Sequence, residues 1–387
     1  MAEKLETKEH KKKEVPEDEL TYIREMLRSM STSQGFIAPH RMIPQVIFTE
    51  VEQHFSSIVI SRFRGLENFI LEKLNRINIF AGANNSGKTS VLEAVYLLTN
   101  LNNIYAFFEI ERQRAKLTDG LYAKWFENNF LFNIELTGVF NGEQVNVSIE
   151  SGQTTDPIDK NGYLATLELH SEVAKEEKDC RVHLYSGKES QFYYKKIVVL
   201  CNSIMTNPYN FNENDLQKAH AKAFNEKKID VVIDFIRNRV DPGIQKIELI
   251  NMSDMNRFSV TSDRFDRSVD LTSFGEGVLR IFQIGLSMAY ASNGVLLIDE
   301  FETAIHKSLL VDFSRFVHQL AREFNVQVFL TSHSKECIDA FVENDYHPEE
   351  ITGFVMKEEM GKRDSKYIDG NRLKRLIGSI DLDIREA

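Results

Sequence analysis

The chain has 387 residues, 42% of them hydrophobic, and a formal net charge of −11, which fits one large or two ordinary folded domains and argues against a protein whose main task is to grip a nucleic-acid backbone. Three widely spaced cysteines argue against a cysteine-based metal site, the charged N-terminus is not a signal peptide, and no apolar run approaches the roughly 20 residues of a membrane span. We therefore expect a cytoplasmic protein with reduced thiols.

The first 46 residues are expected to be an N-terminal extension, with the globular part over 47–387. The extension begins with mixed charges and little to bury, which predicts a disordered tail. A short amphipathic helix is predicted next, and it is either part of a flexible tail or a contact with a partner or a second copy. Its apolar face would carry Leu20, Ile23, Met26 and Leu27.

The stretch Gly82–Thr89 lies between an apolar strand, Ile77–Ala81, and a helical segment that begins at Ser90. This pattern predicts a phosphate-binding P-loop rather than a glycine-rich turn with a stray lysine. Backbone N–H groups and the helix N-terminus would face the phosphates of ATP, Lys88 would reach the β- and γ-phosphates, and Thr89 would bind Mg²⁺. The residues expected to contact the nucleotide are Gly82, Asn84, Asn85, Ser86, Gly87, Lys88, Thr89 and Ser90.

Residues 129–270 are predicted to form a β-rich middle lobe with one or two helices between 212 and 240. Two runs of alternating hydrophobicity meet at Asn141-Gly142, and Asn-Gly between such runs is a strong signal for a β-hairpin. Further strands are expected at 164–169, 180–185, 196–201, 244–250 and 257–260.

The C-terminal third alternates strands and helices, which predicts parallel strands. A buried strand over 294–298 leads directly into Asp299 and Glu300. Asp299 would complete the Mg²⁺ site with Thr89, and Glu300 would orient and deprotonate the attacking water. The next strand ends near His333, which would contact the γ-phosphate; the alternative is that this Ser/Thr-rich segment only caps the following helix.

A Ser-x-Gly-x-Gly run, Ser273–Gly277, opens a helix shortly before the acidic pair. The order of these motifs resembles that of ATP-binding-cassette (ABC) ATPases. The resemblance implies an α/β fold, a P-loop NTPase of the ABC-type ATPase head, with a mixed sheet core, a β-rich lobe and an inserted helical segment. The run departs from the usual Leu-Ser-Gly-Gly-Gln at Phe274 and Gly277. By resemblance, Ser273 and Gly275 would bind the γ-phosphate held by a second subunit; the alternative is a glycine-rich helix cap.

Two further stretches resemble narrower groups. Residues 63–69 and 74–80 resemble the opening of RecF/SMC-type heads, and 299–306 resembles the Asp-Glu-x-Glu-x-Gly-Leu-His run of the OLD family, with Ala304 in place of glycine. OLD nucleases carry a Toprim domain after the ATPase, whereas only about fifty residues follow His333. The resemblance therefore implies that a nuclease or toxin is a separate chain, as in anti-phage systems such as PARIS.

Three functions stay open. In the first, a homodimer or larger homo-oligomer binds ATP and Mg²⁺ at its interface, Lys88, Glu300 and His333 are catalytic, and the ATPase is a sensor or regulator of a separate effector in anti-phage defence. The second is a RecF/SMC-like repair ATPase that binds DNA, and the third is a scaffold of low turnover that holds a toxin inactive. The candidate DNA contacts, which are otherwise a solvated surface, are Arg112, Arg114, Lys116, Lys195 and Lys196.

Overall fold

The computed structural model describes residues 44–114, 133–153, 160–186, 190–208, 213–252, 255–359, 361–380 and 383. The expected N-terminal extension lies outside this range except for residues 44–46, and Lys116 lies outside it too. At the described end of the extension, β1 (Gln45–Val46) pairs in parallel with β10 (Val198–Val199). No described helix is long and apolar enough to cross a membrane.

A six-stranded sheet forms the centre of the molecule and has the order β11-β15-β16-β4-β17-β18. The first five of these strands run parallel, as the alternation of strands and helices predicts, and β18 is antiparallel at one edge. Both faces of the sheet are covered, which explains why its inner strands are mostly apolar. The strands are β4 (Ile77–Ala81), β11 (Asn202–Thr206), β15 (Gly294–Ile298), β16 (Val326–Ser332), β17 (Ile351–Glu359) and β18 (Lys362–Asp369).

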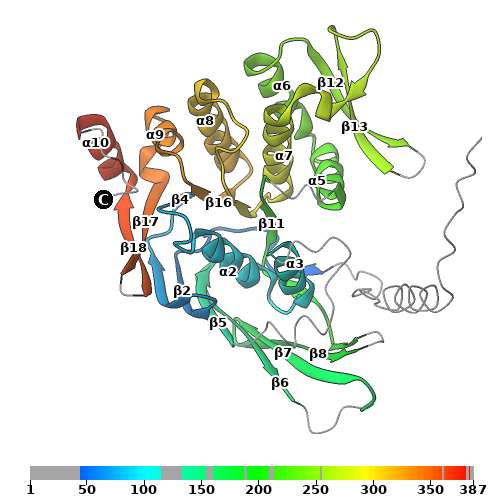
Figure 1. Ribbon diagram of the computed structural model, residues 1–387, viewed down its shortest axis with the longest axis vertical. Coiled ribbons are helices and arrows are strands. Elements are labelled where there is room, and N and C mark those ends of the chain that lie inside the picture. The colour runs from blue at the N-terminus through cyan, green and yellow to red at the C-terminus, as the bar shows by residue number, and fades with distance from the viewer. Residues whose placement is uncertain are drawn as a thin grey trace, which may run out of the picture.

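Helices cover the two faces of the central sheet (Figure 1). The helices α7, α8 and α9 lie on one face, and α2 lies on the other. Nearly the whole circumference of α2 is buried, because a second sheet packs against its outer side. The helices are α2 (Lys88–Asn100), α3 (Ile104–Arg114), α5 (Glu213–Asn225), α6 (Ile229–Arg239), α7 (Glu276–Tyr290), α8 (Lys307–Glu323), α9 (Lys335–Glu343) and α10 (Gly370–Ile380), with 3₁₀ turns η1 (Leu271–Phe274) and η2 (Pro348–Glu350).

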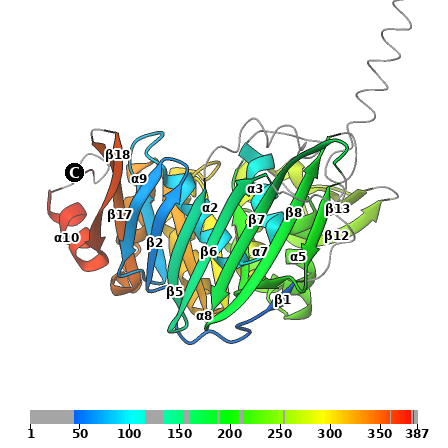
Figure 2. The same ribbon diagram turned by 90° about the horizontal axis from the view of Figure 1, so that it is seen from below.

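The second sheet has seven antiparallel strands in the order β3-β2-β5-β6-β7-β8-β9 (Figure 2). The predicted hairpin is confirmed: β5 and β6 meet at Asn141 and Gly142, whose φ angles of 52° and 77° are those of a tight hairpin turn. The strands are β2 (Ser57–Phe63), β3 (Leu66–Glu72), β5 (Ile134–Phe140), β6 (Glu143–Gly152), β7 (Tyr163–Val173), β8 (Glu176–Tyr185) and β9 (Gln191–Tyr194).

Two hydrophobic cores follow from this layering. One lies between the two sheets around α2, and the other lies between the central sheet and the helices on its opposite face. Neighbouring residues of β4 enter different cores, since Ile79 belongs to one and Phe80 to the other. The strand that leads into the P-loop is therefore fixed from both sides.

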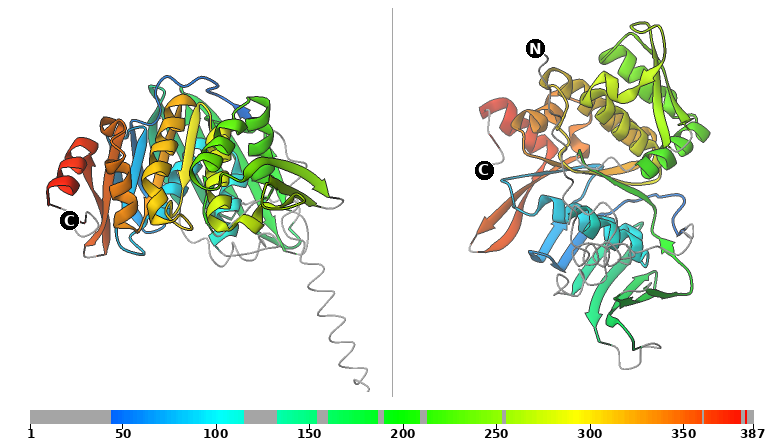
Figure 3. Two further views of the ribbon diagram at one scale, coloured as in Figure 1. Left: turned by 90° about the horizontal axis from the view of Figure 1, so that it is seen from above. Right: turned by 45° about the vertical axis from the view of Figure 1, so that its right-hand side comes forward.

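The segment 129–270, expected as one middle lobe, contributes to several parts of the fold. Its first described strands complete the seven-stranded sheet, and β11 is an edge strand of the central sheet. Only β10 lies within the strand expected over 196–201, and the longer β11 begins just after it. A small sheet of β12 (Ile244–Met252), β13 (Met255–Ser262) and β14 (Val269–Asp270) projects at one end of the molecule (Figure 3).

Candidate functional site

The loops that follow four parallel strands meet at one edge of the central sheet. Thr206 of β11 is opposite Ile298 of β15, which is opposite Leu330 of β16. Ser332 of β16 is opposite Ala81 at the end of β4. The carboxyl ends of these strands are therefore level, and ligands of open α/β sheets bind at such ends. Three segments with predicted roles in ATP binding meet at this end of the sheet, which we call the P-loop edge. They are Gly82–Thr89, Asp299-Glu300 and the segment at His333.

The loop after β4 has the backbone of a phosphate cradle. Gly82 and Gly87 have φ angles of 144° and 97°, which favour glycine. A Cβ atom at Gly82 would also lie within 2.7 Å of the Met356 carbonyl oxygen. The helix α2 begins directly after Gly87 without a side-chain cap, so its first N–H groups are available to an anion.

The side chain of Lys88 lies across this loop. Its Nζ donates hydrogen bonds to the carbonyl oxygens of Gly82 at 2.8 Å and Ala83 at 2.7 Å. Burial lowers the pKa of Lys88 to about 8, although nearby carboxylates, Asp299 foremost, act in the opposite direction. The ammonium group is thus mostly cationic at neutral pH but poorly solvated, and phosphate oxygens would be stronger acceptors than the two carbonyls.

Asp299 follows β15 and contacts the start of α2. Its Oδ2 accepts a hydrogen bond from Thr89 Oγ1 at 3.0 Å, and its Oδ1 accepts one from Thr331 Oγ1 at 2.6 Å. A threonine hydroxyl and an aspartate from these two loops are the protein ligands that Mg²⁺ takes in P-loop enzymes. Thr331 has no predicted role in the site from the sequence, although its position at the end of a parallel strand is a usable signal.

Glu300 lies in a left-handed backbone conformation, with a φ angle of 48°. Its N–H donates to Thr331 Oγ1 at 2.8 Å, and its Oε2 accepts a hydrogen bond from Thr303 Oγ1 at 3.1 Å. The left-handed conformation costs a residue with a Cβ atom about 1–2 kcal/mol, so the surroundings must hold it. Strain of this kind is typical of functional sites.

The loop after β16 is tied to the loop after β15. The backbone N–H of His333 donates to Glu302 Oε1 at 2.7 Å. Ser334 Oγ accepts a hydrogen bond from the Cys337 N–H at 3.2 Å and caps α9. A cap on the following helix is therefore confirmed, and the capping residue is Ser334 and not His333. Glu302 was given no role from the sequence, and it positions the backbone at His333.

A buried arginine from α7 reaches the same edge. Arg280 is 3% exposed, and its Nη2 donates to the Asp299 carbonyl oxygen at 2.8 Å. Burial lowers its pKa to about 10, so the guanidinium stays charged at neutral pH. Arg280 is not among the residues predicted from the sequence, because a charged residue in an amphipathic helix is expected at the surface.

Ser273 and Gly275 stand apart from this cluster. Both are exposed, and within the described part of the chain neither is hydrogen-bonded to the P-loop. The helix that they precede nevertheless packs closely on the loop after β15, since a Cβ atom at Gly277 would lie 2.9 Å from the Ala304 carbonyl oxygen. The structure thus brings the P-loop and the acidic residues together but leaves Ser273 and Gly275 facing solvent.

The residues at this edge fit a nucleotide with Mg²⁺. Ser86 Oγ is buried and, among the described residues, has no hydrogen-bond partner, so a phosphate oxygen could accept from it. Across the described ranges, no cluster of three or more His, Cys, Asp or Glu residues could hold a metal. P-loop enzymes bind Mg²⁺ with one or two protein ligands together with the substrate phosphates, and Thr89 and Asp299 are of the right kind and adjacent.

Two of the candidate DNA contacts are engaged within the chain. Arg112 Nη2 is 2.6 Å from Glu109 Oε1 on the same helix. Arg114 Nε is 2.8 Å from Glu93 Oε1, and its Nη2 donates to Ser90 Oγ on α2 at 2.9 Å. Arg114 therefore fastens α3 to the P-loop helix, and the charge of Arg112 is paired within α3.

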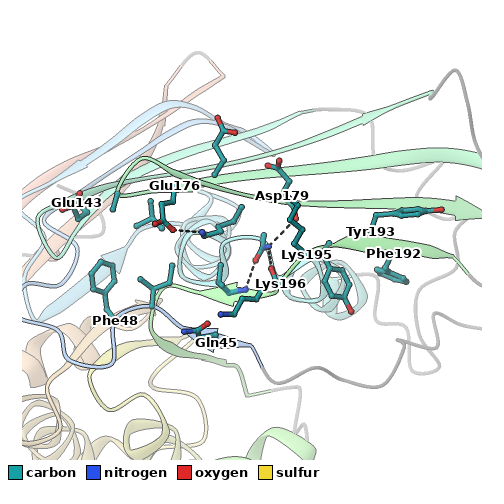
Figure 4. A pocket seen from close by; sticks show the side chains of 17 residues that line it. Gln45, Phe48, Glu143, Glu176, Asp179, Phe192, Tyr193, Lys195 and Lys196 are labelled. Atoms are coloured by element: carbon teal, nitrogen blue, oxygen red, sulfur yellow. Dashed lines mark hydrogen bonds and ion pairs between the residues drawn. The ribbon is translucent and has the colours of Figure 1, made fainter.

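Lys195 and Lys196 are exposed and line a cavity of about 1260 Å³. Figure 4 shows the two lysines near Gln45, with Glu176 and Asp179 of β8 also on the lining. Because charges of both signs line this cavity, it lacks the basic stripe that is typical of a nucleic-acid interface.

The family of the chain follows from residues 77–339. This stretch matches the family described as an AAA domain, a candidate AbiEii toxin and a Type IV TA system. It spans more than half of the chain and includes Lys88, Asp299 and His333. The chain belongs to this AAA-domain family. With the P-loop and the acidic residues described above, this AAA domain is a P-loop ATPase.

The AAA domain resembles several known proteins. The chain is 22% identical over 327 residues to the ATP/GTP phosphatase of Helicobacter pylori, across 73% of this chain and 86% of that protein. A stretch of 50 residues is 44% identical to RecF of Geobacter sulfurreducens, but it covers only 13% of this chain and 14% of RecF. Among solved structures, the SMC head domain from Thermotoga maritima is 13% identical with a TM-score of 0.39, over 81% of this chain and 99% of that one.

Proposed function

We propose that this ATPase hydrolyses ATP between two copies of itself, and that its ATP state controls a separate effector, a nuclease or toxin, in anti-phage defence. One observation carries the first part: the P-loop edge is assembled within one chain, whereas Ser273 and Gly275 are exposed. The family description, which names an AbiEii toxin and a Type IV TA system, supports the control of a toxin. The resemblance of residues 299–306 to the OLD family supports a role in phage defence.

In the proposed site, Lys88 and the N–H groups of the P-loop bind the phosphates of ATP. Thr89 and Asp299 would hold Mg²⁺, which neutralises phosphate charge. The Glu300 carboxylate accepts a proton from water as the water oxygen bonds to the γ-phosphorus and the bond to the ADP oxygen breaks. His333 would contact the γ-phosphate, positioned by the hydrogen bond between its N–H and Glu302.

The second copy would complete this site. Its α7 begins at Glu276 without a side-chain cap, so the helix N-terminus offers N–H groups to an anion. Ser273 and Gly275, just before that terminus, would contact the γ-phosphate from the side opposite the P-loop. Hydrolysis would then require the dimer, whereas ATP binding would require only one chain.

The variant Glu300→Gln tests this function. It keeps the size of the side chain but removes the base, so we expect ATP to be bound and kcat to fall about 100-fold or more. The ATP-bound dimer should then accumulate and be visible by light scattering coupled to gel filtration. Glu323→Gln, at the exposed end of α8, is the control and should behave as wild type. If Glu300→Gln hydrolyses ATP at the wild-type rate, the role given to Glu300 is wrong.

The control of an effector is tested by co-purification with the product of the neighbouring gene. We expect capture that depends on whether ATP is present. Capture in equal amount with and without ATP would favour a scaffold of low turnover instead. No capture in either state would remove the proposed partner.

A further inference from the structure

Arg280 links the two parts of the proposed site, which are the P-loop edge and the segment at Ser273 and Gly275. It is on the second turn of α7, the helix that begins directly after Gly275. Its guanidinium group reaches across to β11 and to the loop after β15. The four hydrogen bonds are to Asp299 O at 2.8 Å, Thr206 Oγ1 at 3.0 Å, Gln283 Oε1 at 3.1 Å and Glu300 O at 3.4 Å.

The bonds to the carbonyl oxygens of Asp299 and Glu300 hold the backbone on both sides of Glu300, and Thr331 Oγ1 accepts from the Glu300 N–H. The strained φ angle of 48° makes such support necessary. Stability alone explains Arg280 poorly, because its buried guanidinium group is desolvated, although the nearby carboxylates, Asp299 foremost, favour its charge. A buried ionic group can often be replaced by a well-packed apolar side chain of similar size without loss of stability.

We propose that Arg280 is a positioning residue that couples the helix α7 to Glu300. When Ser273 and Gly275 engage the phosphate held by a second copy, α7 carries Arg280 with it, and Arg280 sets the Glu300 backbone for hydrolysis. The close approach of Gly277 to the Ala304 carbonyl oxygen provides a second contact between the same two segments. This inference rests on the proposed function, because it needs Glu300 as the base and a partner at Ser273.

The first test is Arg280→Met, which keeps the length of the side chain and removes its donors. We expect kcat to fall between about tenfold and 100-fold, because small misplacements of a catalytic group have effects of this size. The Kd for ATP, measured by calorimetry, should change less than about threefold. Arg76→Met is the matched control: Arg76 Nη1 also donates to a carbonyl, that of Ala321 at 3.0 Å, but at the opposite end of the central sheet. It should leave kcat unchanged.

A double mutant separates positioning from a general loss of structure. If Arg280 acts through Glu300, adding Arg280→Met to Glu300→Gln should lower the residual kcat less than about twofold further. Losses that multiply would show that Arg280 acts independently and would overturn the inference. Failure of the proposed function is distinguishable, since Glu300→Gln alone would then have the wild-type rate.

If circular dichroism shows that Arg280→Met does not fold, Thr206→Val is the second variant that tests the same inference. It preserves the shape of the side chain and removes one acceptor of Arg280. We expect kcat to fall about threefold to tenfold with the Kd for ATP unchanged. A wild-type kcat in Thr206→Val, or in a folded Arg280→Met, would overturn the inference.

Discussion

The P-loop edge and the Ser273 segment differ in how their polar groups are satisfied. At the P-loop edge, Thr89 and Thr331 both donate to the Asp299 carboxylate, so hydrogen bonds join α2, β16 and the loop after β15 within one chain. Ser273 and Gly275 are exposed instead, and a 3₁₀ turn rather than a strand holds them. Under the proposed function, this difference means that one chain preorganises the chemistry of the site and a second copy completes it.

Among changes at the P-loop edge, removing the Lys88 side chain should have the largest effect on ATP binding. In Lys88→Ala the loop loses the cation that would replace its bonds to Gly82 and Ala83 with bonds to phosphate. We expect the Kd for ATP to rise about 100-fold or more, measured by calorimetry. Lys222→Ala is the control, because Lys222 is also desolvated and donates to a carbonyl, that of Tyr290 at 2.8 Å. An unchanged Kd in Lys88→Ala would contradict phosphate binding by the loop.

Changing Ser273 should affect turnover and not binding. In Ser273→Glu a carboxylate would face the γ-phosphate of the second copy, so we expect kcat to fall about 100-fold while the Kd for ATP stays within about threefold. Ser268→Glu, at another exposed serine of the same region, should be close to wild type. Weaker ATP binding by the Ser273→Glu monomer would mean that Ser273 belongs to the site of its own chain.

Mixing two inactive variants tests directly whether the P-loop edge of one copy works together with Ser273 of the other copy. In a mixed dimer of Lys88→Ala and Ser273→Glu, both changes fall in one of the two sites and the other site is intact. With random exchange, half of the dimers are mixed and each has one working site, so we expect about a quarter of the wild-type rate. Mixtures that stay inactive would contradict a site shared between copies.

The P-loop edge is well predicted from the sequence, because the sequence signals for it are local. Gly82–Thr89 is bounded by an apolar strand and a helix, and Asp299 directly follows four buried apolar residues. Likewise, Asn141-Gly142 marks its hairpin because few residues tolerate two successive positive φ angles. Each of these features is decided by neighbours within a few residues.

The contacts that tie the site together could not be predicted, because their partners are distant in the sequence. Arg280 is buried only because β11 and the loop after β15 supply acceptors. Strand β11 owes its place to pairing with β15, and β18 was missed because this polar strand at the sheet edge shows little hydrophobic alternation. Tertiary context decides such features.

A change at Ala304 should have the smallest effect of those considered. Ala304 lies in the loop after β15, against which Gly277 of α7 packs. It stands where the resemblance expects glycine, and its φ angle of 68° explains that expectation. Ala304→Gly should remove steric strain but also loosen the unfolded chain, so we expect the free energy of unfolding to rise by at most about 1 kcal/mol.

The urea midpoint of Ala304→Gly, with the slope m unchanged, measures this difference. Ala221→Gly is the matched control, because Ala221 is also exposed but lies within the helix α5, where glycine should lower the free energy of unfolding by about 1 kcal/mol. If both variants lower the midpoint equally, the Cβ atom of Ala304 is not strained. A rise in Ala304→Gly alone would show that the turn against which Gly277 packs is held in its left-handed conformation by the fold and not by its own residue.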